Sequence, residues 1–217
     1  MKFAIVPVKD PSRAKERLSS ILPQDVRTAL AYAMLEDVLT ALAGSGLLDR
    51  KFIVSLDTTA IKIAEDLGIE VIHETEQKGE SASVDFASRI CKEMGAQSVL
   101  VIPGDAPLIT TEDIDFILER ESDAPSAILV PARDYLGTNA ILRKPPDAFP
   151  SLFGHDSFRK HLDEAAGRNI KIDTFENPRI ALDIDNPDDL REFASIKSDT
   201  KTYELLSGMN LLNKVAG

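Results

Sequence analysis

The feature of this sequence that most restricts its fold is an alternation of short, β-branched apolar runs with longer segments of helical spacing. The run from Lys2 to Val8 is typical of a buried strand, and it stops at Lys9-Asp10-Pro11. The segment from Gln24 to Ala43 repeats apolar residues every three or four positions and stops at Gly44, as an amphipathic helix does. The same alternation continues to Pro131. It predicts a parallel sheet covered by helices on both faces.

The pattern is looser after Pro131. The expected elements there are short strands at Asn139–Leu142, Ile170–Phe175 and Ile180–Asp185, a helix at His155–Ala166 and another that begins at Asn186-Pro187. The expected fold is a single-domain, three-layer α/β/α structure with a mostly parallel mixed sheet, over residues 1–197. A tail, 198–217, follows; a helix is one option for it, and its leucines need burial either on the domain or on a partner.

The composition excludes several classes of protein. The net charge of −11 argues against nucleic acid as a partner, since a phosphate backbone requires a basic surface. No apolar run approaches the ~20 residues that cross a bilayer, so no membrane association is expected. Cys91 is the only cysteine, which fits a reducing, cytoplasmic location.

One basic cluster stands out in this acidic chain. It lies in the loop after the first strand and contains Lys9, Arg13, Lys15 and Arg17. The loop contains no glycine and matches neither GxxxxGK[ST] nor GxGxxG, so it cannot hold phosphates mainly through backbone amides. Cationic side chains suit a triphosphate, and we expect the segment from Ile5 to Leu18 to bind a nucleoside triphosphate. The alternative is a solvated loop that happens to be basic.

Three aspartates occupy the ends of predicted strands, where an open parallel sheet binds its ligands. Asp105 follows the strand that ends in V-I-P, and Asp183 and Asp185 lie in A-L-D-I-D-N-P. On a strand, residues two apart face the same side at roughly 6.5–7 Å, and two carboxylates there repel unless a cation lies between them. We therefore expect Asp105, Asp183 and Asp185 to hold Mg²⁺. The alternatives are a turn aspartate at Asp105 and a helix cap at Asp185 or Asn186.

Five motifs occur in order along the chain: K-x5-K-x-R-L (Lys9 to Leu18), P-G-D-x-P-L (Pro103 to Leu108), G-T-N (Gly137 to Asn139), F-G-x-x-S-F (Phe153 to Phe158) and L-D-I-D-x-P-x-D-L (Leu182 to Leu190). Together they resemble the 2-phospho-L-lactate guanylyltransferase family of deazaflavin (coenzyme F420) biosynthesis, whose fold is of the nucleotide-diphospho-sugar transferase (GT-A-like, Rossmann-like) kind. The match spans about residues 2 to 195.

The resemblance implies that GTP and 2-phospho-L-lactate, or phosphoenolpyruvate in some similar members, react to give a diphospho-guanosine product and pyrophosphate. It implies three sets of site residues. The catalytic residues would be Lys9, Lys15, Arg17 and Asp105; those that bind the small phospho-acid would be Thr138, Gly154 and Ser157; and those that bind the nucleotide would be Val6, Pro7, Val8, Lys9, Lys15, Gly79 and Ser81. Asp105, Asp183 and Asp185 would hold the metal.

One stretch departs from the family pattern. The base loop of the family often reads G-L-N-x-A, whereas this chain has Gly79-Glu80-Ser81-Ala82-Ser83. How guanine is selected is therefore left open. Two alternatives to the guanylyltransferase are a same-fold nucleotidyltransferase with another base or a sugar-phosphate acceptor, and a nucleotide-binding regulatory domain without catalysis. Similar family members are often homodimers, and a homodimer is expected here.

Overall fold

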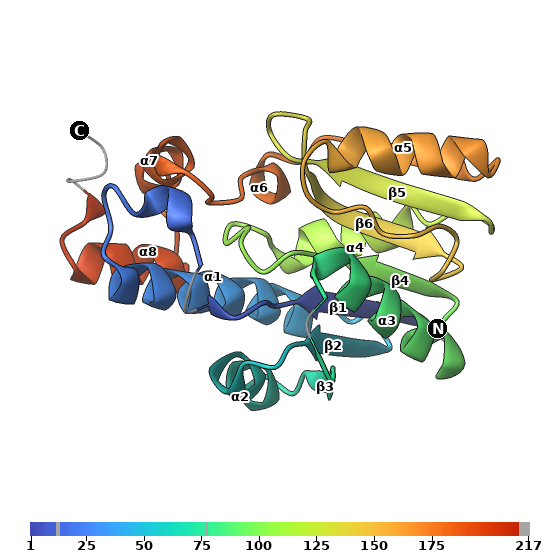
Figure 1. The fold of residues 1–217 in the computed structure, drawn as a ribbon, viewed down its shortest axis with the longest axis horizontal. Coiled ribbons are helices and arrows are strands. Elements are labelled where there is room, and N and C mark those ends of the chain that lie inside the picture. Colours follow the sequence, from blue (N-terminus) through green and yellow to red (C-terminus); the bar gives the residue numbers. More distant parts are fainter. Residues whose placement is uncertain (12–13, 77, 213–217) are drawn as a thin grey trace.

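One mixed sheet of seven strands runs through the computed structural model, which describes residues 1–11, 14–76 and 78–212 (Figure 1). The strands are β1 (Lys2–Pro7), β2 (Arg50–Val54), β3 (Glu70–Ile72), β4 (Ser98–Val101), β5 (Ser126–Pro131), β6 (Thr138–Lys144) and β7 (Lys171–Thr174). The helices are α1 (Gln24–Gly44), α2 (Thr58–Asp66), α3 (Glu80–Glu93), α4 (Thr111–Glu119), α5 (Ser157–Gly167), α6 (Pro178–Ala181), α7 (Pro187–Ser195) and α8 (Lys201–Gly208), with a 3-10 helix η2 (Glu16–Leu18). None of these helices is both long and apolar enough to span a bilayer.

The strand order is β3-β2-β1-β4-β6-β5-β7, and only β6 runs against its neighbours. This confirms the predicted mostly parallel mixed sheet. Val101 at the end of β4 pairs with Ile141 of β6. Since β6 is antiparallel to β4, Thr138 at the start of β6 lies at the edge where β1 and β4 end. The first residues of β6, rather than its last, therefore lie beside the loops that follow β1 and β4.

Each face of the sheet is covered by its own set of helices, which confirms the three-layer prediction. Because successive side chains of a strand point to opposite faces, Ala4 and Val6 pack against α1, α2 and α4. Phe3 and Ile5 pack on the other face against α3 and α5. The two apolar layers hold β1 and β4 rigidly, and the loops that follow these strands carry the charged residues of interest.

The predicted strand at Ile180–Asp185 is wrong. Asn177 caps a short helix there, α6, by accepting hydrogen bonds from Arg179 N and Ile180 N, and Pro178 stands at its first position. The residues after α6 reach α7 without a strand partner. Leu182 and Ile184 are nevertheless buried, against α1, α7 and α8. The apolar-polar alternation that indicated a strand therefore reflects a segment with one buried side.

The tail packs on its own chain. Figure 1 shows α8 along the first half of α1, and residues of α7 share an apolar cluster with both helices. Leu206 is fully buried there, and the other tail leucines that the structure describes are partly buried in the same cluster. The Asp37 carboxylate of α1 accepts hydrogen bonds from Lys201 N (2.6 Å), Thr202 N (2.9 Å) and Thr202 Oγ1 (2.6 Å) at the start of α8. Of the two predicted fates of the tail leucines, burial on the domain is the one observed.

Candidate active site

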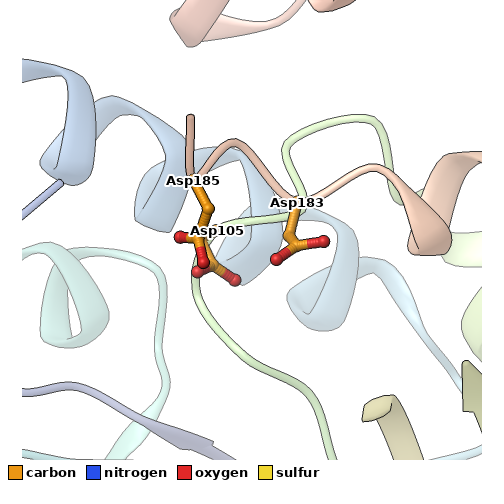
Figure 2. A group of neighbouring side chains, drawn as sticks. All are labelled: Asp105, Asp183 and Asp185. Carbon is orange, nitrogen blue, oxygen red and sulfur yellow. The ribbon is translucent and has the colours of Figure 1, made fainter. Parts of the chain in front are cut away.

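Asp105, Asp183 and Asp185 converge at the edge of the sheet. Asp105 lies in the loop between β4 and α4, and the other two lie between α6 and α7. Each aspartate contributes one carboxylate oxygen to a group of three that all lie within 4.8 Å of one another. Figure 2 shows the three side chains facing a common point. Ile184 N donates a hydrogen bond of 3.1 Å to Asp105 O, which fastens the two segments together.

Of the two residues considered as helix caps, Asp185 and Asn186, it is Asn186 that caps α7. The side chain of Asn186 accepts hydrogen bonds from the backbone of Asp188 and Asp189, and the Asp189 carboxylate accepts one from Asn186 N, so this pair forms the capping box of α7. Asp185 N also donates to Asp189 Oδ2 (3.1 Å), but the side chain that caps α7 is that of Asn186, so the Asp185 carboxylate takes no part in the cap. A helix cap therefore does not account for Asp183 or Asp185.

The cluster has the chemistry that a divalent cation requires. Asp105 Oδ1 is buried, and it has no hydrogen-bond partner in the described part of the chain. Burial raises the pKa of Asp183 to about 7, with further contributions from the negative charges of Asp105 and Asp185. Asn139 Nδ2 donates to Asp183 Oδ1 (2.9 Å) and holds that carboxylate in place. An orphaned carboxylate oxygen in a site with excess negative charge fits Mg²⁺, which takes one or two carboxylates and completes its shell with water and phosphate oxygens.

Lys15 projects into this cluster from the basic loop. Its Nζ lies 2.8 Å from Asp105 Oδ2 and 2.7 Å from Asp185 Oδ1. Burial on its own would lower the pKa of Lys15, but the two carboxylates outweigh it and the pKa is raised. The backbone of Lys15 is left-handed (φ 56°), a conformation that costs a non-glycine residue energy, and Arg27 Nη1 donates to its carbonyl oxygen (3.3 Å). The loop is thus shaped to deliver this ammonium to the carboxylates.

Two cavities meet at the cluster. The first, of about 470 Å³, lies beside the loop after β1, and the second, of about 450 Å³, lies beside the start of β6 and of α5. Four residues line both cavities: Glu80, Pro103, Asp105 and Asp185. A ligand in one cavity would therefore meet a ligand in the other across the same carboxylates.

The predicted nucleotide-binding residues are only partly gathered in the first cavity. Its lining includes Pro7, Val8, Lys9 and Lys15. Val6 is fully buried in the core and lines neither cavity. Gly79 and Ser81 line neither cavity, whereas Glu80 between them lines both and pairs with Lys9 (3.3 Å). Arg13 lies outside the described residues.

The predicted acceptor residues lie together. Thr138, Gly154 and Ser157 all line the second cavity, although they come from two segments of the chain. Gly154 has φ 110°, a conformation that glycine adopts without strain, and it turns the chain toward the start of α5. Arg17 lines this second cavity rather than the first. His155 is exposed and also lines the second cavity.

His161 is a residue of this region that sequence reasoning missed. It is fully buried, its Nδ1 lies 3.0 Å from Thr138 Oγ1, and its Nε2 accepts a hydrogen bond of 2.8 Å from Leu152 N. The available signal was its position four residues after Ser157, which places both side chains on one face of α5. Burial, followed by the positive charge of Arg143, lowers the pKa of His161 to about 4.

This depressed pKa predicts a pH-dependent contribution to stability. A histidine that is neutral when folded takes up a proton on unfolding at any pH between about 4 and its unfolded value near 6.5. The stability that it contributes is present above pH 6.5 and is lost as the pH falls toward 4, by on the order of 2–3 kcal/mol. Urea unfolding from pH 7.5 to 4.5 should show a smaller loss for His161→Gln than for the wild type.

The difference in pH dependence between the wild type and His161→Gln isolates the contribution of His161 from that of other titratable groups. Asp183 acts in the opposite direction, because a carboxyl group whose pKa is raised on folding stabilises the protein as the pH falls. Its contribution is common to both proteins and cancels in the difference. Identical pH slopes for the two proteins would contradict the prediction.

Comparisons with known proteins agree with this site. The model of the family "Guanylyl transferase CofC like" matches residues 1–215. The chain is 38% identical to a phosphoenolpyruvate guanylyltransferase of Rubrobacter xylanophilus, over 87% of this chain and 91% of that protein. It is 35% identical to a 3-phospho-D-glycerate guanylyltransferase of Colwellia psychrerythraea (93% and 94%) and 29% identical to a 2-phospho-L-lactate guanylyltransferase of Methanosphaera stadtmanae (96% and 90%).

The fold also has solved counterparts. A crystal structure from Desulfovibrio desulfuricans, titled as a nucleotide-diphospho-sugar transferase, superposes with a TM-score of 0.79 at 19% identity, covering 99% of this chain and 97% of that one. At this identity the likeness establishes the fold alone, and it confirms the predicted fold class. The family match over nearly the full length and the relatives above 30% identity go further: this chain belongs to the CofC-like guanylyl transferases.

Proposed function

We propose that this protein transfers the guanylyl group of GTP to a small phospho-acid, 2-phospho-L-lactate or phosphoenolpyruvate, with Mg²⁺ as the metal, in deazaflavin coenzyme biosynthesis. The observation that carries the proposal is the pair of cavities with Asp105 and Asp185 in the wall of both. A transfer between two bound substrates requires two adjoining cavities with a shared wall, because the reacting atoms of the two substrates must come into contact beside the charged groups. The names of the relatives supply the guanylyl donor and the class of acceptor.

In the proposed reaction an oxygen of the acceptor phosphate attacks the α-phosphorus of GTP. The new P–O bond forms as the bond to the β-phosphate oxygen breaks, and pyrophosphate leaves with that electron pair. The attacking oxygen is already anionic, so no general base is needed, and catalysis rests on positioning and charge neutralisation. When bound by Asp105, Asp183 and Asp185, Mg²⁺ would neutralise phosphate oxygens and orient them.

The residues of the chain divide this work between the two cavities. Lys9 and Lys15, which line the first cavity, would offset the charge of the triphosphate and of departing pyrophosphate. Arg17, at the wall of the second cavity, would act on the phosphates from the acceptor side. Thr138, Gly154 and Ser157 would hold the phospho-acid.

The decisive experiment is a matrix of substrates. Purified protein is incubated with each of the four NTPs, Mg²⁺ and one of four acceptors: 2-phospho-L-lactate, phosphoenolpyruvate, 3-phospho-D-glycerate or a sugar 1-phosphate. Pyrophosphate release is expected only with GTP and a phospho-acid, and chelation by EDTA should abolish it until Mg²⁺ is restored. Release only with the sugar 1-phosphate would overturn the proposal. Nucleotide binding without release under any condition would favour the regulatory alternative.

A homodimer and a cytoplasmic location are also proposed, on the family pattern and the single cysteine. The described tail leucines pack on the body of their own chain and so give no support to a dimer. Sedimentation equilibrium should give twice the mass of 23.7 kDa if the dimer forms.

A further inference from the structure

His161 has a defined hydrogen-bonding role that the proposed reaction does not yet use. It lies one turn after Ser157 on α5, and both side chains reach the hydroxyl group of Thr138 at the start of β6. The rings of Phe149 and Phe153 pack around it, with centroids 6.2 and 5.2 Å from that of His161. The imidazole is thus fixed in orientation beneath the acceptor cavity.

The tautomer of His161 follows from its partners. A backbone N–H can only donate, so the bond from Leu152 N at 2.8 Å requires a free lone pair on Nε2. A neutral imidazole with a lone pair on Nε2 carries its proton on Nδ1. Since the lowered pKa keeps the buried ring neutral, Nδ1–H donates to Thr138 Oγ1, 3.0 Å away.

The direction of the Thr138 hydroxyl follows in turn. Thr138 Oγ1 accepts from His161 Nδ1 and, at 3.4 Å, from Ser157 Oγ, so both of its lone pairs are engaged. Its own hydrogen remains, and among the described residues these two groups are the only hydrogen-bond partners of that hydroxyl. Thr138 lines the acceptor cavity. Its O–H is therefore left to donate to a ligand.

We propose that His161 is a positioning residue of the acceptor subsite, and that it fixes the Thr138 hydroxyl as a donor toward an anionic oxygen of the acceptor, a carboxylate or phosphate oxygen. The inference rests on the proposed function, in which the second cavity holds the phospho-acid. A hydroxyl that is locked as a donor pays no reorientation cost when the anion binds, and it favours an oxygen that can only accept.

Two substitutions at His161 separate its two hydrogen bonds. In His161→Gln the side-chain oxygen reaches the position of Nε2 and can still accept from Leu152 N, but the donor to Thr138 is lost. In His161→Asn the amide nitrogen lies near the position of Nδ1 and can still donate to Thr138, but the contact with Leu152 is lost. Each is made in the wild type and with Thr138→Val, which keeps the shape of the side chain and removes the hydroxyl. His73→Gln, at an exposed position that lines neither cavity, is the matched control.

A hydrogen bond to a charged group is worth enough to change binding ~10-fold or more, so Thr138→Val should raise the acceptor KM by about that factor. His161→Gln should raise it ~5-fold, with kcat and the KM for GTP within about 2-fold of wild type. His161→Asn should lie closer to wild type than His161→Gln. With Thr138→Val already present, His161→Gln should change the acceptor KM by less than about 2-fold, because its effect passes through that hydroxyl.

Other results overturn the inference. Equal increases in the acceptor KM with and without Thr138→Val, or a parallel increase in the KM for GTP, would show that His161 acts only by supporting the fold. The same conclusion would follow if His161→Asn, shown to be folded by circular dichroism, raised the acceptor KM as much as His161→Gln does. Calorimetric titration with phosphoenolpyruvate and Mg²⁺ is run on every variant. A wild type that binds it but transfers no nucleotide contradicts the proposed function, while the same comparison of affinities still tests His161.

Discussion

Asp105→Asn should lower the turnover number at least ~10²-fold, as happens when one preorganised electrostatic group is removed from an active site. The change preserves the shape of the side chain and removes one negative charge. Asp105 Oδ2 accepts from Lys15, and Oδ1 is buried without a partner in the described chain, so Oδ1 is the oxygen left to bind a metal. An amide offers a single oxygen, and its NH₂ group would face Lys15 or the metal. The partial positive charge of that NH₂ group would be repelled by either cation.

The measurement is kcat at saturating GTP, acceptor and Mg²⁺, with folding checked by circular dichroism. Asp147→Asn is the matched control, since Asp147 is also paired with a lysine, Lys92, but lines neither cavity. We expect its turnover to stay within about 2-fold of wild type, in the range of ordinary surface changes. Near-normal turnover of folded Asp105→Asn would remove Asp105 from the metal site.

The gathering of the three aspartates could be predicted from sequence, but part of the reasoning was wrong. Asp105 follows a buried strand of a parallel sheet, and such strands end at a common edge. Asp183 and Asp185 were predicted to share a face of a strand that does not exist. They share a side because Leu182 and Ile184 are buried against α1, α7 and α8. Alternation reports one-sided burial, and only pairing partners distant in sequence decide whether that burial makes a strand.

The acceptor side depended on information that a local pattern does not contain. Thr138 reaches the same edge because β6 is antiparallel to β4, and neither strand direction nor order can be read from a short apolar run. The motif resemblance nevertheless grouped Thr138 with Gly154 and Ser157, which do line one cavity. His161 shows the complementary limit, since its spacing from Ser157 is visible in sequence but its contact with Thr138 is a tertiary feature.

The basic loop shows how far charge pattern alone extends. Four cations in an acidic chain indicated a polyanion, and Lys9 and Lys15 do line the cavity at the end of β1. The pattern gave no sign that Lys15 would lie between two carboxylates, because that contact joins residues 90 and 170 positions apart. Charges that neutralise one another across such separations are set by the fold.

Lys15→Met should change turnover and metal affinity in opposite directions. Turnover should fall ~10²-fold, because the substitution removes the cation that we propose acts on the phosphates from the cluster. The affinity of the nucleotide-free protein for Mg²⁺ should rise several-fold. In the free protein the ammonium lies within 2.8 Å of oxygens of Asp105 and Asp185 and competes with a metal for them, and its removal leaves the cluster more negative.

The same substitution makes stability depend on the metal. Removing one partner of a buried ion pair leaves uncompensated charge and destabilises a protein by several kcal/mol, here reduced by the partial exposure of Asp105 and Asp185. We expect a lower melting temperature than wild type in EDTA, and a larger rise than wild type on adding Mg²⁺, since a ligand that binds the folded state stabilises it. Lys92→Met, which breaks the exposed pair with Asp147, should show neither effect.

Calorimetric titration with Mg²⁺ and melting curves give the affinity for Mg²⁺ and the melting temperature without any turnover, so they report on the cluster whatever the acceptor is. An unchanged or weaker affinity for Mg²⁺ in folded Lys15→Met would mean that Lys15 does not compete for the metal site, and its ion pairs would then be a structural feature of the loop alone.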